Sequence, residues 1–267
     1  DIGWQKKIEK PLLDLSFFGE NIESNIFFDI NAGTIYNLNE KQLELIDADT
    51  GQLSEVFELE TDRIISGVSV GYNSFFYVDA DGIVYAHDAN SGDLKWKKEL
   101  EDVVLSKILI TSTQAFLQTS SDVLYGMDLQ TGETKWQKQA QAPLLSIRGT
   151  ASPIIYEGLI FTSFSNGRLA AVRAVDGIQL WEKPISRLKG STELEKLMDG
   201  DSNAITINEE VFVANYNGSL TRFNIRSGDK VFSVDHSTSK PILFNKGKIL
   251  SINTCLLYTS DAADDRS

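Results

Sequence analysis

Few residues of this 267-residue chain have the types and spacing that catalysis or metal binding needs. The two histidines, His87 and His236, stand far apart, and neither has the spacing that marks a zinc site or the base of a nucleophile. Because His87 follows an apolar stretch, we expect it at the surface beside a turn. Residues 79–82 (Asp-Ala-Asp-Gly) begin like a calcium-binding loop but lack the later glutamate, so we expect an ordinary turn. The residue types therefore predict no catalytic residue, no metal site and no cofactor.

Charge and hydropathy exclude two further classes of function. The chain has 25 Lys and Arg against 38 Asp and Glu, a formal net charge of −13. A protein this acidic lacks the basic surface that collects phosphates, so we expect neither a nucleic-acid binder nor a polybasic membrane-surface protein. Mean hydropathy is −0.16, and no apolar run reaches the roughly 18 residues that a membrane-spanning helix needs. The composition, with 42% hydrophobic residues, is that of a folded globular protein.

The last residues, 255–267, differ from everything before them. Residues 255–264 (Cys-Leu-Leu-Tyr-Thr-Ser-Asp-Ala-Ala-Asp) resemble the translation of a transposase-type sequencing adapter. We therefore expect 255–267 to be a non-native tail outside the fold, with a natural polar tail as the alternative. The only cysteine, Cys255, lies in this tail, and the natural gene would continue past Thr254.

A repeat organises the rest of the chain. Five glycines stand 41, 40, 45 and 51 residues apart: Gly51, Gly92, Gly132, Gly177 and Gly228. Eight residues before each glycine stands an apolar residue, and one residue before it stands a small turn former. Four residues after it stand, in the last four copies, Trp96, Trp136, Trp181 and Phe232. The first copy departs from the pattern, with Glu55 in the aromatic position.

One repeat, residues 152–185, shows the expected local structure. Short apolar or alternating segments at 152–155, 159–164, 168–174 and 178–181 predict four strands, separated by turn residues. Asn166-Gly167 predicts a two-residue type I′ hairpin, in which both positions need positive φ. Polar and apolar residues alternate with period two, so no helix is expected here. Each repeat is therefore predicted to be a four-stranded antiparallel meander.

Such a meander cannot bury both faces alone and must stack against copies of itself. A period of about 40 to 50 residues with four strands is typical of a β-propeller. We therefore predict an all-β propeller of four-stranded antiparallel blades, with five complete blades and the start of another at 242–252. Aromatic rings at one register in successive repeats are interpreted as structural residues that dock neighbouring blades, not as a carbohydrate platform, which would not recur in every repeat. These residues are Trp96, Trp136, Trp181 and Phe232.

The extra length between the fourth and fifth repeats lies at 186–203. Thr192 and Glu195 have the spacing of a capping box ahead of apolar residues, which predicts a short helical loop between blades. Loops that extend from a rigid scaffold are common places for partner contacts.

The repeat resembles known propeller families. The pattern Asp88-x3-Gly92-x3-Trp96, with its copy one repeat later, resembles the tryptophan-docking motif of pyrroloquinoline-quinone-type propellers. The stretches 146–153, 165–169, 190–201 and 214–220 are more specific and resemble the BamB family of the outer-membrane β-barrel assembly machinery. The likeness runs from about Trp4 to Thr254. Family members have eight blades, so the resemblance implies that 1–254 is a partial propeller domain with about six of an expected eight blades.

The resemblance implies a scaffold that binds the periplasmic (POTRA) domains of BamA through two neighbouring inter-blade loops, with unfolded outer-membrane proteins as a further partner. By matching motif, the partner-binding residues would be Leu145, Ile147, Arg148, Asp199 and Asp201. From residue types alone, Leu145 and Ile147 could instead be strand core, and the two aspartates could be a polar turn or could hold Arg148 without touching the partner. The family implies a lipoprotein at the periplasmic face of the outer membrane. Its signal sequence and lipid-bearing cysteine are not in this sequence, which we interpret as a fragment.

An enzyme is the main alternative. Quinone-dependent dehydrogenases share this propeller and resemble one another in a vicinal cysteine pair and a calcium site near the cofactor. The chain has one cysteine and so no such pair. We therefore expect a non-catalytic protein, with a quinone-dependent dehydrogenase and a propeller module for another partner as the alternatives.

Overall fold

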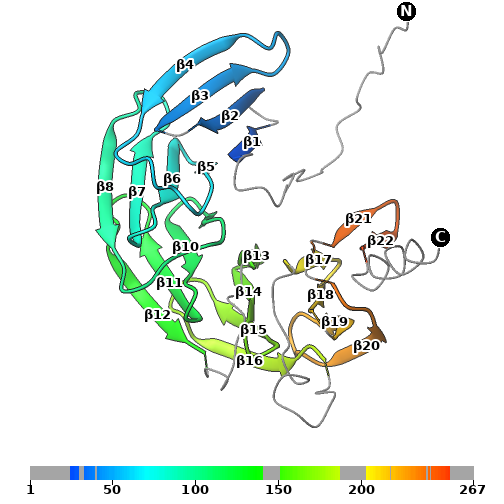
Figure 1. Cartoon of the computed structure of the whole chain (residues 1–267). Helices are drawn as coiled ribbons and strands as arrows, with labels where there is room; N and C mark the ends of the chain where they lie inside the picture. The colour runs from blue at the N-terminus through cyan, green and yellow to red at the C-terminus, as the bar shows by residue number, and fades with distance from the viewer. Residues whose placement is uncertain are drawn as a thin grey trace, which may run out of the picture.

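A computed structural model describes residues 25–29, 33–39, 41–140, 151–186, 203–216, 218–238, 240 and 242–252. All regular structure in these ranges is β-strand, arranged in five four-stranded antiparallel sheets and one two-stranded hairpin. Each sheet pairs its strands in chain order, so each is a simple meander. Figure 1 shows the sheets following one another around a common centre, with the first strand of each sheet inside and the fourth at the outer rim. The predicted propeller fold is confirmed.

The strands have the following bounds. The first sheet contains β1 (Asn25–Asp29), β2 (Thr34–Asn39), β3 (Gln42–Asp47) and β4 (Leu53–Glu58). The second contains β5 (Ser69–Gly71), β6 (Ser74–Val78), β7 (Ile83–Asp88) and β8 (Leu94–Glu99). The third contains β9 (Leu109–Ile110), β10 (Gln114–Gln118), β11 (Val123–Asp128) and β12 (Thr134–Gln139). The fourth contains β13 (Ile154–Tyr156), β14 (Leu159–Phe164), β15 (Arg168–Arg173) and β16 (Gln179–Pro184). The fifth contains β17 (Ile205–Ile207), β18 (Glu210–Ala214), β19 (Ser219–Asn224) and β20 (Lys230–Asp235), and the hairpin is β21 (Leu243–Asn245) with β22 (Lys248–Leu250).

The prediction of a type I′ turn at Asn166-Gly167 is wrong. Only Gly167 of this pair has positive φ, at 71°. Its N–H donates to the carbonyl of Phe164 at 2.9 Å, which closes a three-residue loop that includes Ser165. Three-residue hairpin loops need one left-handed residue, which glycine supplies. The extra loop residue has a tertiary role, because Ser165 bonds to the neighbouring sheet.

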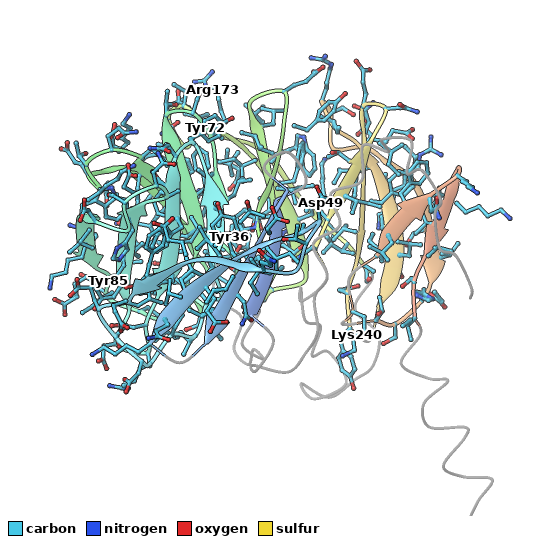
Figure 2. All side chains as sticks on the ribbon, turned by 90° about the horizontal axis from the view of Figure 1, so that it is seen from above. Tyr36, Asp49, Tyr72, Tyr85, Arg173 and Lys240 are labelled. Carbon is cyan, nitrogen blue, oxygen red and sulfur yellow. The ribbon has the colours of Figure 1, made fainter. Side chains whose placement is uncertain are left out.

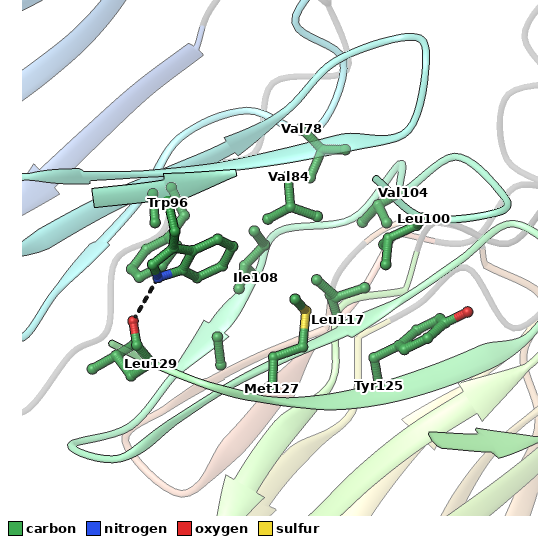
Figure 3. Packing of buried hydrophobic residues seen from close by; sticks show 13 residues of the cluster. Val78, Val84, Trp96, Leu100, Val104, Ile108, Leu117, Tyr125, Met127 and Leu129 are labelled. Carbon is green, nitrogen blue, oxygen red and sulfur yellow. Dashed lines mark hydrogen bonds between the residues drawn. The ribbon is translucent and has the colours of Figure 1, made fainter. Parts of the chain in front are cut away.

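The hydrophobic cores lie between sheets. Figure 3 shows the core that the second and third sheets share, which includes Val84, Trp96, Leu117 and Met127. Similar clusters join the first sheet to the second, the third to the fourth and the fourth to the fifth. Each sheet therefore depends on its neighbours for the burial of its apolar side chains.

Three tryptophans sit at these boundaries and make the same contact each time. The indole N–H of Trp96 donates to the carbonyl of Leu129 in the third sheet at 3.0 Å (Figure 3). The indoles of Trp136 and Trp181 donate to carbonyls of the next sheet at 2.9 and 2.8 Å.

Each of these indole rings also lies against a repeat glycine of the following sheet. A Cβ atom at Gly132 would come within 2.5 Å of the Trp96 ring, and Gly177 and Gly228 are as close to the next two tryptophans. The repeat glycines thus provide both a positive φ and the space for an indole.

In the first sheet a different residue covers the repeat glycine of the following sheet. Glu55 pairs with Leu45 in the register of the tryptophans but is exposed. Two residues later, Phe57 is buried, stacks on Phe75 at 5.8 Å between ring centroids and covers Gly92. The side chain of Phe57 has no N–H group, so this boundary lacks the hydrogen bond that an indole makes at the others.

The fourth aromatic residue of the repeat, Phe232, is 37% exposed. Its described contacts are within its own sheet, with the ring of Phe212 at 6.3 Å and the guanidinium of Arg222 at 5.7 Å. Its docking onto a further sheet stays a prediction.

Replacement of Trp96 by Ala is expected to lower the free energy of unfolding by about 3 to 5 kcal/mol, because it removes a buried ring between two sheets. Trp96→Phe is expected to cost less, since it keeps most of the ring but loses the bond to Leu129. Urea unfolding checks both values, with the exposed neighbour Lys97→Ala as control. A loss for Trp96→Ala no larger than that of the control would contradict the docking role.

Candidate functional site

The five sequence-predicted partner-binding residues lie in two connections, 141–150 and 187–202, that are outside the described residues. They are Leu145, Ile147, Arg148, Asp199 and Asp201. The structure does describe the residues on both sides of each connection. Those flanking residues show where the chain leaves one sheet and enters the next.

Both connections run from the outer strand of one sheet to the inner strand of the next, from β12 to β13 and from β16 to β17. They therefore leave and enter at the same face of the ring. Lys240 marks this face in Figure 2, because it lies in the equivalent connection between β20 and β21. Tyr72 and Arg173 lie at the opposite face. The strands that flank 141–150 and 187–202 thus end and begin at this face.

The starts of both connections are fixed by hairpins of their own sheets. Ala140, the last described residue before 141–150, donates its N–H to the carbonyl of Asp122 at 3.1 Å. Ile185, just before 187–202, donates in the same way to Gly167 at 3.0 Å. The repeat therefore places equivalent anchors ahead of both connections.

Two described residues that follow the connections are tied to each other. Asn203 follows 187–202, and its Oδ1 accepts a hydrogen bond from the backbone N–H of Ser152 at 2.7 Å. The hydroxyl of Ser152 accepts from the N–H of Lys107 at 3.1 Å, and the N–H of Ile108 donates to the hydroxyl of Ser69 at 3.0 Å. We name the set Ser69, Lys107, Ile108, Ser152 and Asn203 the inner belt. It links the approaches to the inner strands of four successive sheets.

The inner belt borders a cavity of about 570 Å³ inside the ring. The cavity is lined by β5, β9, β13 and β17 and the residues around them, with aliphatic side chains such as Ile110, Ile154 and Ile205 between serine, threonine and asparagine. No carboxylate, histidine or cysteine is among the described lining residues. Across the described ranges, no three His, Cys, Asp or Glu side chains gather as a metal site would require. The titratable side chains in this lining are those of Tyr72 and Lys107.

Asp122 is a buried polar residue that the sequence analysis did not single out. It stands where Gly82 and Gly167 stand in their repeats and has a positive φ of 61°. Its buried carboxylate accepts hydrogen bonds from the N–H and hydroxyl of Ser165 in the next sheet and from the amide of Gln118. Burial raises the pKa of the Asp122 carboxyl. The available signal was the replacement of a repeat glycine by Asp122 at this position. The structure makes Asp122 a link between the third and fourth sheets.

The prediction that His87 lies at the surface is wrong. His87 is 1% exposed and stacks on Phe75, with 4.8 Å between ring centroids. Its Nδ1 is 2.9 Å from the carbonyl of Gly92, which can only accept, so Nδ1 carries the proton. Its Nε2 then accepts from the hydroxyl of Tyr77 at 3.1 Å. The position of His87 in the repeat was the available signal for its burial. His87 stands five residues before its repeat glycine, and the residues at this position in the next three repeats are buried: Met127, Val172 and Phe223.

The other residues of chemical interest have structural contacts. The turn at Asp79 is confirmed: its carboxylate accepts from the N–H groups of Asp81 and Ile83 at 3.0 and 2.9 Å. The Nε2 of His236 lies 2.8 Å from the hydroxyl of Ser251, which follows β22.

Comparison with known proteins places these features in a family. A family model described as "Outer membrane protein assembly factor BamB" matches residues 39–266. The chain is similar to the protein of that name from Escherichia coli K12, with 37% identity over 172 residues, which are 64% of this chain and 44% of the relative. The relative from Salmonella typhimurium is 32% identical, over 78% of this chain and 53% of the relative. The relative from Yersinia pestis is 27% identical, over 79% of this chain and 56% of the relative. The chain thus spans about half the length of these curated relatives.

Solved structures show the same fold. The crystal structure of BamB from Moraxella catarrhalis superposes with a TM-score of 0.77 and 23% identity, and covers 86% of this chain and 69% of that one. A europium-containing methanol dehydrogenase superposes with a TM-score of 0.57 and 12% identity, over 75% of this chain and 49% of the enzyme. An outer-membrane protein assembly factor and an enzyme therefore share this architecture, and the fold alone does not decide the activity.

The stability of the protein is expected to fall as the pH drops below about 6.5, in part through His87. Burial lowers the pKa of His87 below its ordinary value. The unfolded chain therefore binds a proton at a higher pH than the native protein does, and the free energy of unfolding decreases between the ordinary and the lowered pKa by at most about 1.4 kcal/mol per pH unit.

The variant His87→Met, which copies Met127 of the next sheet, isolates this contribution. The difference in unfolding free energy between the wild type and His87→Met should change over this pH range and be constant above it. A constant difference from pH 8 to pH 5 would contradict the assignment.

Proposed function

Because the chain belongs to the BamB family of outer-membrane protein assembly factors, we propose that it is a non-catalytic scaffold of the β-barrel assembly machinery that binds the periplasmic (POTRA) domains of BamA. The observation that carries this proposal is the bond between Ser152 and Asn203. It joins two residues that follow, in the sequence, the two connections with the predicted partner-binding residues. Residues that are far apart in the sequence can therefore contribute to one contact surface.

The residue types in the two connections suit a protein interface. Leu145 and Ile147 would provide an apolar anchor, and Arg148 a charged group that can bond a carboxylate with two parallel N–H donors. Asp199 and Asp201 would either contact the partner or pair with Arg148 and orient it. Either role uses the proximity of the two connections.

We propose that the protein catalyses no reaction. The chain has a single cysteine, so the vicinal pair of quinone-dependent dehydrogenases is absent from it. The described lining of the cavity contains no carboxylate that could act as a base or a calcium ligand. The alternative of an enzyme rests on the fold shared with a methanol dehydrogenase, and a propeller module with another partner is the remaining alternative.

The proposed location is the periplasmic face of the outer membrane, with attachment through an N-terminal lipid. No segment that the structure describes forms a helix with the length and apolarity that bilayer crossing requires. Unfolded outer-membrane proteins are proposed as further partners. We also propose that 255–267, which lie outside the described residues, are a non-native tail to the propeller domain 1–254.

Arg148→Glu is expected to weaken binding to the BamA POTRA domains more than about tenfold, because a charge reversal opposes the proposed carboxylate pairing. The melting temperature should stay within about a degree of the wild type, since surface changes have small effects on stability. Calorimetric titration and thermal melts check the two expectations.

Arg173→Glu is the matched control for this experiment. Arg173 lies at the opposite face (Figure 2) in an exposed ion pair with Asp176, and its reversal should leave binding unchanged. Equal affinities of Arg148→Glu and the wild type would remove Arg148 from the site.

Addition of pyrroloquinoline quinone and calcium is expected to produce neither a bound-quinone absorbance nor dye-linked oxidation of alcohols. The reason is the absence of a cysteine pair from the chain and of carboxylates from the described cavity lining. A bona fide quinone dehydrogenase assayed in parallel is the positive control. Turnover by this protein would overturn the scaffold proposal in favour of the enzyme.

A further inference from the structure

We propose that the cavity inside the ring binds an extended segment of another polypeptide, through main-chain hydrogen bonds to the edges of the inner strands. The inference goes beyond the proposed function, because it concerns the described cavity wall and does not depend on binding to BamA. The wall consists of β5, β9, β13 and β17 and the residues around them. The cavity volume of about 570 Å³ lies within the range of roughly 300 to 1,000 Å³ that is typical of ligand sites.

Each of the four inner strands has one unpaired edge. Every one of them is the first strand of its sheet and pairs only with the second strand. Figure 1 shows β5, β13 and β17 on the inner side of their sheets, so the unpaired edges border the cavity. A free strand edge presents backbone N–H and C=O groups that can pair with another chain.

The register of the first of these hairpins identifies the backbone groups that point into the cavity. In an antiparallel pair, residues that exchange two hydrogen bonds alternate with residues whose N–H and C=O point away from the partner strand. The β5–β6 hairpin has a two-residue turn, Tyr72-Asn73, with φ values of 50° and 58°, so Gly71 and Ser74 form the hydrogen-bonded pair that closes it. Val70 is the next residue along β5 and therefore directs its N–H and C=O away from β6 and into the cavity that it lines.

The fourth and fifth sheets repeat this geometry. Their first hairpins have two-residue turns at 157–158 and 208–209, again with positive φ at both positions. One residue before each closing pair stand Ile155 in β13 and Thr206 in β17, both in the position of Val70. Both residues line the cavity.

The third sheet contributes Ile110 in the same way. The N–H of Thr111 donates to the carbonyl of Gln114 at 2.8 Å, so Thr111 belongs to a bonded pair and the preceding Ile110 does not. Four successive sheets thus each direct one backbone donor and one backbone acceptor into the cavity. We name these residues the cavity-facing set: Val70, Ile110, Ile155 and Thr206.

The inner belt holds this wall in place at one end. Its three hydrogen bonds, at 3.0, 3.1 and 2.7 Å, link the approaches to the four inner strands. Farther along, β5 and β9 touch, because a Cβ atom at Gly71 would lie 3.6 Å from the side chain of Ile110. A site that is formed before binding loses less conformational entropy on association.

The chemistry of the lining favours a polypeptide with aliphatic side chains. A peptide unit carries one N–H donor and one C=O acceptor, which is the complement of what each cavity-facing residue offers. The aliphatic side chains of the wall, such as Ile154 and Ile205, can cover apolar side chains of the bound segment. Main-chain bonds would supply affinity, and the aliphatic wall would select the side chains.

Amide hydrogen exchange followed by NMR tests the proposal in the 267-residue protein. The probe is the peptide acetyl-Thr-Val-Thr-Val-Thr-amide, and its control is the same peptide with N-methyl groups on both valines. In the free protein, the N–H of Thr206 should exchange at least about tenfold faster than that of Ile205, which bonds within the β17–β18 ladder. The peptide should slow exchange at the cavity-facing set, and the N-methylated peptide should bind at least about tenfold more weakly.

Variants at position 206 test the same backbone group from the side of the protein. Thr206→Pro removes the N–H, whereas the matched control Thr206→Ala keeps it. Because this N–H takes no part in the ladder, Thr206→Pro should melt within a few degrees of Thr206→Ala. We expect Thr206→Pro to bind the peptide about fivefold to tenfold more weakly than Thr206→Ala, which corresponds to the loss of one hydrogen bond.

Four results would overturn the inference. Unchanged exchange at the cavity-facing set with about 1 mM peptide would show that the cavity does not take an extended segment. Equal affinity for the peptide and its N-methylated form would show that main-chain bonds do not hold it. Equal affinity of Thr206→Pro and Thr206→Ala would exclude the backbone of position 206. Unfolding of Thr206→Pro alone would show that its N–H belongs to the ladder and does not face the cavity.

Discussion

The fold depends on the contact of a flat aromatic ring with a glycine of the neighbouring sheet. A meander of four short strands has two faces and cannot bury either without a partner, so its stability comes from what lies between sheets. At three boundaries a tryptophan covers the repeat glycine and donates its indole N–H to a carbonyl three residues before that glycine. The contact gives the indole N–H a hydrogen-bond acceptor, while the large apolar ring is packed between two sheets. It also fixes each sheet relative to the next.

Polar contacts add a second set of links at the hairpin ends and around the inner cavity. Asp122 bonds to Ser165 across one boundary, and Ser186 bonds to Asn215 across the next. The inner belt does the same beside the first strands of four sheets. Because sheets in this arrangement share no backbone ladder, side chains at a few positions decide how the inner ends are spaced. The connections that carry the proposed partner surface begin and end at these positions.

The first boundary shows how the same architectural need is met by different chemistry. Phe57 covers Gly92 in place of an indole and offers no hydrogen-bond donor. Here the apolar layer contains His87, whose Nδ1–H bonds to the carbonyl of Gly92 and whose Nε2 accepts from Tyr77. A neutral histidine can be fully satisfied in such a place but resists protonation, which makes this boundary the one in the described ring that responds to pH through a buried histidine. The same architecture occurs in BamB and in a methanol dehydrogenase, so the fold alone does not decide the activity.

The sequence by itself determined the repeat, the four strands of each sheet and the aromatic register, because these depend on local patterns of period two and on turn residues at fixed offsets. It could not determine that Phe57 replaces an aromatic residue missing from its expected position, that His87 is buried, or that Gly167 sits in a three-residue loop. Each of these depends on a neighbouring sheet about 40 residues away in the chain. The same reason explains why Asn203 and Asp122 went unnoticed among ordinary polar residues. Only the stacking of the sheets brings Ser152 to Asn203 and Ser165 to Asp122. For Asp122, which is buried, the hydrogen bonds from Ser165 then replace those that water would make.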